Sequence, residues 1–196
     1  VTQRGVRGMK VFQTADDYSM YLTLLKEETA ERGVAISAYC LMPNHIHLMA
    51  TPSTEEALAK AIGNTHRRFT RCVNMREKAT GYLFQGRFFS CPMDDEYFFI
   101  AARYIEQNPV RAGLCKKPWD DPWSSAAFHT YVKKKGPLSR SSREFPKPKE
   151  WRELLQVESD GINNVRDCTR NGRPCGSVVF MKRAEKVSGR ALSLKK

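Results

Sequence analysis

The chain has 196 residues and carries 33 Lys and Arg against 21 Asp and Glu, a formal net charge of +12. This length suits one domain plus a small appendage, and the positive charge favours polyanionic partners such as nucleic acid. No stretch approaches the roughly 18 apolar residues that cross a bilayer, and six scattered cysteines without a Cys-x-x-Cys pair are typical of reduced thiols in a cytosolic protein.

The first half of the chain predicts strands on both sides of a helix. Residues 1–4 are typical of the end of a strand. Thr14 is a favourable start for a helix, and Gly33 is placed to end it. Residues 34–41 and 45–51 alternate as strands, and Pro43-Asn44 between them supplies turn chemistry, which predicts a hairpin.

A second helix is predicted from the segment 53–56 onwards, with an apolar stripe and a basic face. The basic face carries Lys60, Arg67, Arg68 and Arg71. Such a face is compatible with simple solvation, and in a chain of this charge it is equally compatible with phosphate contacts.

The segment 81–93 predicts a turn followed by another strand, and 96–107 predicts a third helix. Pro109 disfavours helical backbone at Asn108, so we expect this helix to end or kink there. The resulting order predicts an α+β fold, a ferredoxin-like or RRM-like antiparallel sheet backed by helices.

The last third of the chain changes in composition. Residues 132–149 are rich in lysine, serine and proline and predict a basic linker, and 151–155 and 177–186 predict helices. We therefore expect a catalytic domain over 1–131, a linker over 132–149 and a small helical C-terminal region over 150–196.

His45 and His47 flank one aliphatic residue in an apolar run. Because side chains alternate along a strand, both imidazoles lie on one face and can converge on one cation. A histidine on a strand is more often a hydrogen-bonded structural residue, so the pair by itself does not decide between these roles.

The third helix carries Tyr104 and Asn108, four residues apart and so on one face. With the histidine pair opposite, a divalent ion held by the imidazoles and the amide would polarise a phosphodiester that Tyr104 attacks. Tyr104 can equally be a packing residue and Asn108 a helix cap, and Glu106 and Gln107 are rival ligands.

Two segments carry a family resemblance, Leu41-Met-Pro-Asn-His-Ile-His-Leu48 and Tyr104-Ile-Glu-Gln-Asn-Pro-Val-Arg-Ala-Gly-Leu114. Together they closely resemble the REP-associated tyrosine transposases, a branch of the single-strand HUH transposases. The segments 1–5, 83–88, 122–125 and 172–176 also resemble recurring parts of that family.

The resemblance implies that His45, His47 and Asn108 bind Mg²⁺ or Mn²⁺ and that Tyr104 is the nucleophile. The expected substrate is single-stranded DNA with REP-type hairpin ends, cleaved through a 5′-phosphotyrosine in a prokaryotic cytoplasm. Monomer and homodimer both stay open. We assign DNA contacts to six basic residues: Arg4, Lys60, Arg67, Arg68, Arg71 and Arg87.

The competing interpretation is a non-catalytic protein that binds a single-stranded DNA or RNA hairpin, with structural histidines. It differs in one respect that is easily measured, because only the transposase forms a covalent bond between Tyr104 and DNA.

Overall fold

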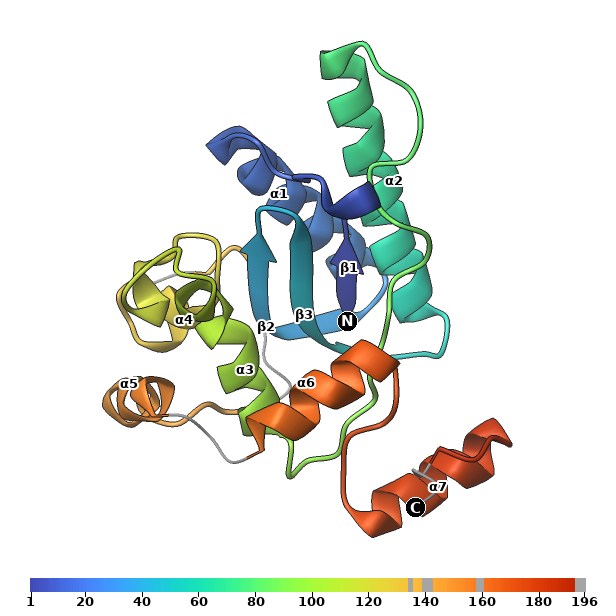
Figure 1. Cartoon of the computed structure of the whole chain (residues 1–196), viewed down its shortest axis with the longest axis vertical. Helices are drawn as coiled ribbons and strands as arrows, with labels where there is room; N and C mark the ends of the chain where they lie inside the picture. Colours follow the sequence, from blue (N-terminus) through green and yellow to red (C-terminus); the bar gives the residue numbers. More distant parts are fainter. Residues whose placement is uncertain (134–135, 139–142, 158–160, 193–196) are drawn as a thin grey trace.

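A three-stranded antiparallel sheet lies at the centre of the computed structural model, which describes residues 1–133, 136–138, 143–157 and 161–192 (Figure 1). The strands are β1 (Thr2–Arg4), β2 (Val34–Met42) and β3 (His45–Pro52), in the order β1-β3-β2. The predicted strands at 1–4, 34–41 and 45–51 and the hairpin between the last two are confirmed.

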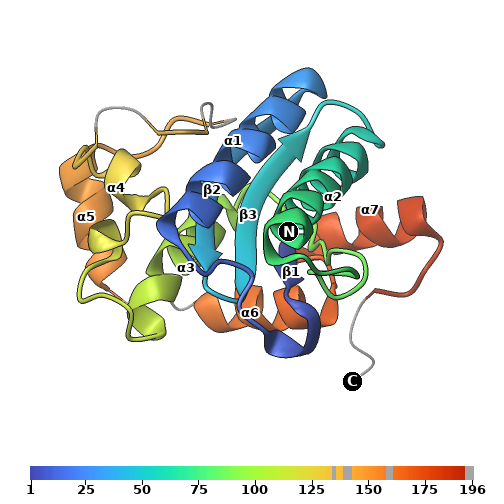
Figure 2. The ribbon, with the colours of Figure 1, turned by 90° about the horizontal axis from the view of Figure 1, so that it is seen from above.

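Helices cover both faces of the sheet, which confirms the predicted α+β class. Figure 2 shows α1 (Ala15–Glu31) and α2 (Ala57–Glu77) on one face and α3 (Phe98–Arg111) and α6 (Ile162–Asn171) on the other. The remaining helices are α4 (Ala126–His129), α5 (Pro148–Gln156), α7 (Val178–Ser188) and the 3-10 turns η1 (Val6–Gly8) and η2 (Pro118–Asp120).

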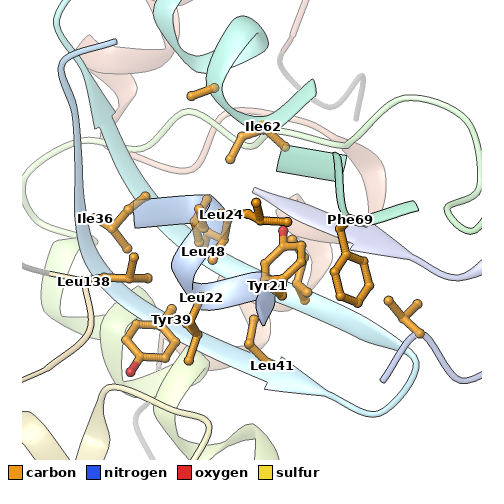
Figure 3. Close-up of a cluster of buried hydrophobic side chains, with 14 of the residues drawn as sticks. Tyr21, Leu22, Leu24, Ile36, Tyr39, Leu41, Leu48, Ile62, Phe69 and Leu138 are labelled. Atoms are coloured by element: carbon orange, nitrogen blue, oxygen red, sulfur yellow. The ribbon is translucent and has the colours of Figure 1, made fainter. Parts of the chain in front are cut away.

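The helices α1 and α2 pack on the sheet through an apolar core (Figure 3). Tyr21, Leu48 and Phe69 are among its fully or almost fully buried side chains. Successive side chains of β3 point to opposite faces of the sheet. Ile46 and Leu48 therefore face this core, and His45, His47 and Met49 face the layer of α3. The strand period thus separates the packing residues of β3 from its histidines.

The start of α1 follows the sequence prediction closely. The Thr14 hydroxyl accepts from the Asp17 N–H at 3.3 Å, and the Asp17 carboxylate accepts in return from the Thr14 N–H at 3.0 Å. This reciprocal capping satisfies backbone donors that a helix end leaves open. Gly33, with φ +66°, follows directly after the last turn.

The segment 81–93 is not a regular strand, so the prediction of a further strand was wrong. It runs beside β1, where Thr2 and Phe89 exchange two backbone hydrogen bonds of 2.9 Å, but the pairing consists of isolated bridges. Between those bridges lies Gly86, whose φ of +62° turns the backbone out of the extended conformation.

The predicted end of this helix at Asn108 was wrong, because α3 continues through Pro109 to Arg111. Proline supplies no N–H to the Ile105 carbonyl one turn earlier. The Asn108 side-chain N–H donates to the Tyr104 carbonyl at 2.7 Å and to the Ile105 carbonyl at 3.4 Å, and the contact to Ile105 supplies a donor in place of the missing one.

The C-terminal part contains one helix that the sequence did not reveal. The predicted helices 151–155 and 177–186 correspond to α5 and α7, but α6 lies between them. Within the predicted linker 132–149, residues 134–135 and 139–142 lie outside the described residues. Of the rest, Leu138 is buried in the core and Phe145 packs 5.0 Å from the Trp151 ring.

Candidate active site

β3 places His45 and His47 side by side on the face that α3 covers. Their ring centroids are 4.9 Å apart, at an interplanar angle of 79°. His45 pairs with Arg4 of β1, and His47 pairs with Thr2. The pair therefore stands at the middle strand of the sheet, where hydrogen bonds from both sides fix its backbone.

Both imidazoles are neutral at pH 7. Burial, with a smaller contribution from Arg4, lowers the pKa of His45 to about 4. Burial lowers the pKa of His47 well below its ordinary value, with smaller electrostatic contributions from His45, the N-terminal amine and Arg4. A neutral imidazole keeps a lone pair for a cation.

Asn44 fixes the orientation of His45. Its Oδ1 lies 2.6 Å from His45 Nδ1, and we assign the proton to Nδ1 because the amide oxygen is an acceptor. This contact leaves Nε2 of His45 as the nitrogen with an available lone pair. Hydrogen bonds of this kind orient metal-binding histidines in other proteins.

α3 brings Tyr104 to the histidines. The Tyr104 ring lies 5.6 Å from the His47 ring, nearly perpendicular to it, and is 9% exposed. Burial raises the pKa of Tyr104, and four arginines oppose this rise: Arg111, Arg166, Arg170 and Arg4. The phenol is thus largely buried, with several positive charges near it.

A cavity of about 900 Å³ joins these groups. Its lining includes His45, His47, Tyr104 and Asn108, so the structure brings together all four residues of the predicted constellation. Arg4 and Arg87, both predicted DNA contacts, line the same cavity.

The rival ligands do not line this cavity. The Glu106 carboxylate is fully buried elsewhere, where it accepts from Trp151 Nε1 at 2.8 Å. Gln107 donates to the Leu155 carbonyl at 2.8 Å. Of the three consecutive candidates, Asn108 alone reaches the histidines' cavity.

The other four predicted DNA contacts lie on α2, on the opposite face of the sheet (Figure 2). Arg68 is bonded to Glu27 and Glu28, and Lys60 is bonded to Glu56. Arg67 and Arg71 are exposed. The structure does not bring these four residues to the cavity.

Sequence reasoning missed three arginines of the cavity, namely Arg111, Arg166 and Arg170. Arg111 follows Tyr104 by seven residues, two helical turns, so the sequence did contain a signal for its position. Arg166 and Arg170 belong to α6, and only the docking of that helix on α3 brings them to Tyr104.

The donor set can be tested against a divalent ion. The described residues contain no group of three His, Cys, Asp or Glu side chains placed to hold a metal. Two neutral imidazoles and an amide oxygen face one cavity instead, and imidazole and carbonyl oxygen are both ligand types for ions such as Mn²⁺. The residues present therefore fit a divalent cation.

Comparison with known proteins supplies the family. A sequence model described as Transposase IS200 like matches residues 7–108, more than half of the chain. The chain belongs to the IS200-like transposase family. The match includes both histidines, Tyr104 and Asn108, and it ends before α6.

This chain shares its fold with a solved structure of a REP-associated tyrosine transposase bound to a REP hairpin. The TM-score is 0.57 at 18% identity, over 74% of this chain and 86% of that one. No protein of curated function matches the sequence. Family and fold thus agree with the resemblance carried by the two motifs.

None of the described helices has both the length and the apolar character to cross a membrane.

Proposed function

We propose that this IS200-like transposase is a metal-dependent single-stranded DNA endonuclease and strand transferase with Tyr104 as its nucleophile. The observation that carries the proposal is the single cavity in which Tyr104 faces two neutral histidines. A phenol beside two potential metal ligands and a set of arginines is suited to a phosphodiester, not to a neutral substrate.

His45, His47 and Asn108 are the residues that would hold Mg²⁺ or Mn²⁺. When bound, the ion supplies positive charge to the oxygens of the scissile phosphate. Asn44 orients His45 through the contact at Nδ1, and the Asn108 amide N–H is occupied by backbone carbonyls, which leaves its Oδ1 for the cavity.

The reaction exchanges one phosphodiester for another. The Tyr104 oxygen loses its proton and forms a bond to phosphorus, while the bond from phosphorus to the 3′ oxygen breaks. The 3′ oxygen takes up a proton and leaves as a hydroxyl, so the DNA 5′ end stays attached to Tyr104. Attack by another 3′ hydroxyl reverses these steps and joins the end to a new strand.

We propose REP-type hairpin ends as the substrate. The support is the fold shared with a transposase whose solved structure contains a REP hairpin. We further propose that residues 1–131 form the catalytic part, and that residues 150–196 assist DNA binding or regulation.

The test is a covalent adduct. The protein is mixed with a labelled single-stranded oligonucleotide that carries the hairpin flanking its own gene, together with Mn²⁺ or Mg²⁺, and resolved on a denaturing gel. Label should migrate with protein for the wild type, and Tyr104→Phe, His45→Ala and added chelator should each abolish the adduct.

Tyr82→Phe is the matched control, because Tyr82 is 91% exposed and does not line the cavity. It should form the adduct at the wild-type rate. Hairpin binding by the wild type without any adduct would instead support the non-catalytic binding protein.

A further inference from the structure

The cavity wall formed by α3 and α6 carries positive charge close to Tyr104. The Arg111 guanidinium carbon lies 5.5 Å from the centroid of the Tyr104 ring. Arg166 and Arg170 line the same cavity and act electrostatically on the Tyr104 phenol. The three arginines therefore surround one reacting group, although they come from two helices.

Within the residues that the structure describes, no carboxylate neutralises these charges. No carboxylate in the described ranges forms an ion pair with Arg111, Arg166 or Arg170, and no Asp or Glu is among the described lining residues of the cavity. On α2, by contrast, Arg68 and Arg76 are bonded to carboxylates. The wall is thus set up for an anion from outside the chain.

α6 is held firmly enough to direct its arginines. Ile162 and Val165 are buried in the core that α3 shares, and Gly161 lies against Ile100 so closely that an added Cβ would be 2.8 Å from its Cδ1. Asn164 Nδ2 donates to the Tyr97 hydroxyl at 3.3 Å. The first half of the helix is therefore fixed against α3.

Arg166 and Arg170 are one helical turn apart, about 6 Å along the axis. They consequently offer two separate contacts along an extended ligand, in the cavity that Arg111 also lines. Arginine is suited to this role because its planar guanidinium binds two oxygens of one phosphate.

We propose that Arg111, Arg166 and Arg170 form a phosphate-binding wall that holds the DNA backbone on either side of the cleavage point against Tyr104. This inference rests on the proposed function and adds to it that α6, which lies beyond the segment matched by the family, completes the active site. The C-terminal region then acts in the reaction through the guanidinium groups of Arg166 and Arg170.

Two measurements on Arg166→Ala/Arg170→Ala test the wall, with the flanking-hairpin oligonucleotide as probe. The first is binding in chelator at several salt concentrations. Each phosphate contact to a single strand contributes about 0.7 to the slope of log affinity against log salt, so the slope should fall in magnitude by about 1.4. The second is the rate of adduct formation at saturating oligonucleotide with Mn²⁺, which should fall at least tenfold.

Lys116→Ala/Lys117→Ala is the control, because it removes the same charge from exposed residues that do not line the cavity. Its adduct rate should equal that of the wild type. Arg166→Lys/Arg170→Lys should restore most of the salt slope, which guards against misfolding of the alanine variant.

The proposal is overturned if Arg166→Ala/Arg170→Ala matches Lys116→Ala/Lys117→Ala in both the salt slope and the rate of adduct formation. A wild-type protein that binds the hairpin but forms no adduct would contradict the transferase activity alone. In that case the salt slope still decides whether Arg166 and Arg170 contact phosphates, so the two failures are distinguishable.

Discussion

Burial keeps His45 and His47 neutral, and Asn44 determines which nitrogen of His45 stays free. The pKa of His45, lowered to about 4, means that its lone pair is available throughout the neutral range. Asn44 belongs to the β2–β3 turn and also donates to the Gly8 carbonyl at 3.3 Å, so its side chain is held from both ends. It is a positioning residue for a possible metal ligand.

Asn44→Ala should raise the Mn²⁺ concentration needed for half-maximal adduct formation about 10- to 100-fold, the usual effect of losing a partner of a ligating histidine. Hairpin binding in chelator should not change, since Asn44 does not line the cavity. A titration of adduct yield against Mn²⁺ for wild type and variant measures this, and superimposable curves would contradict the role of Asn44.

Three consecutive polar residues of α3, Glu106, Gln107 and Asn108, have different structural roles. Successive side chains of a helix point about 100° apart, so Glu106, Gln107 and Asn108 face three different surroundings. Glu106 enters a buried network with Ser125, His129 and Trp151, Gln107 bonds to the α5 backbone, and Asn108 faces the cavity. The structural and the candidate catalytic residues of α3 are thereby adjacent in sequence.

Glu106→Ala should lower the free energy of unfolding by about 3–5 kcal/mol, because three polar groups would lose their shared acceptor in a buried site. Urea unfolding measures the change. Glu31→Ala, which removes an exposed carboxylate near Arg32, should cost less than about 1 kcal/mol. Equal losses in the two variants would show that the Glu106 network does not stabilise the fold.

At the scale of the whole molecule, two C-terminal helices, α5 and α6, share a core with the sheet. Trp151, Leu155, Ile162 and Val165 are buried in the same cluster as Tyr104 and Met49. α7 has no buried residue and lies apart from this core (Figure 1). The proposed catalytic and C-terminal parts are therefore not separate packing units.

We expect residues of the sheet, α3, α5 and α6 to unfold in a single cooperative transition. Differential scanning calorimetry should give equal calorimetric and van't Hoff enthalpies, the signature of two-state unfolding. Two resolved transitions, or a C-terminal part that melts while the sheet stays folded, would contradict this expectation.

The sequence alone determined the features that depend on local period and chemistry. The alternation of side chains along a strand placed the imidazoles of His45 and His47 on one face of the sheet. The spacing of four residues placed Tyr104 and Asn108 together on one face of their helix. Capping chemistry at Thr14 gave the start of α1. The antiparallel sheet backed by helices followed from the order of these elements.

Local compensation and tertiary contacts decided the rest. Pro109 remains in α3 because Asn108 occupies the carbonyls of Tyr104 and Ile105, and segment 81–93 forms only isolated bridges to β1 because Gly86 interrupts its extended backbone. The arginines of α6 reach Tyr104 because Ile162 and Val165 bury against α3. Each of these depends on contacts between residues distant in sequence or on a local compensation that period and propensity do not encode.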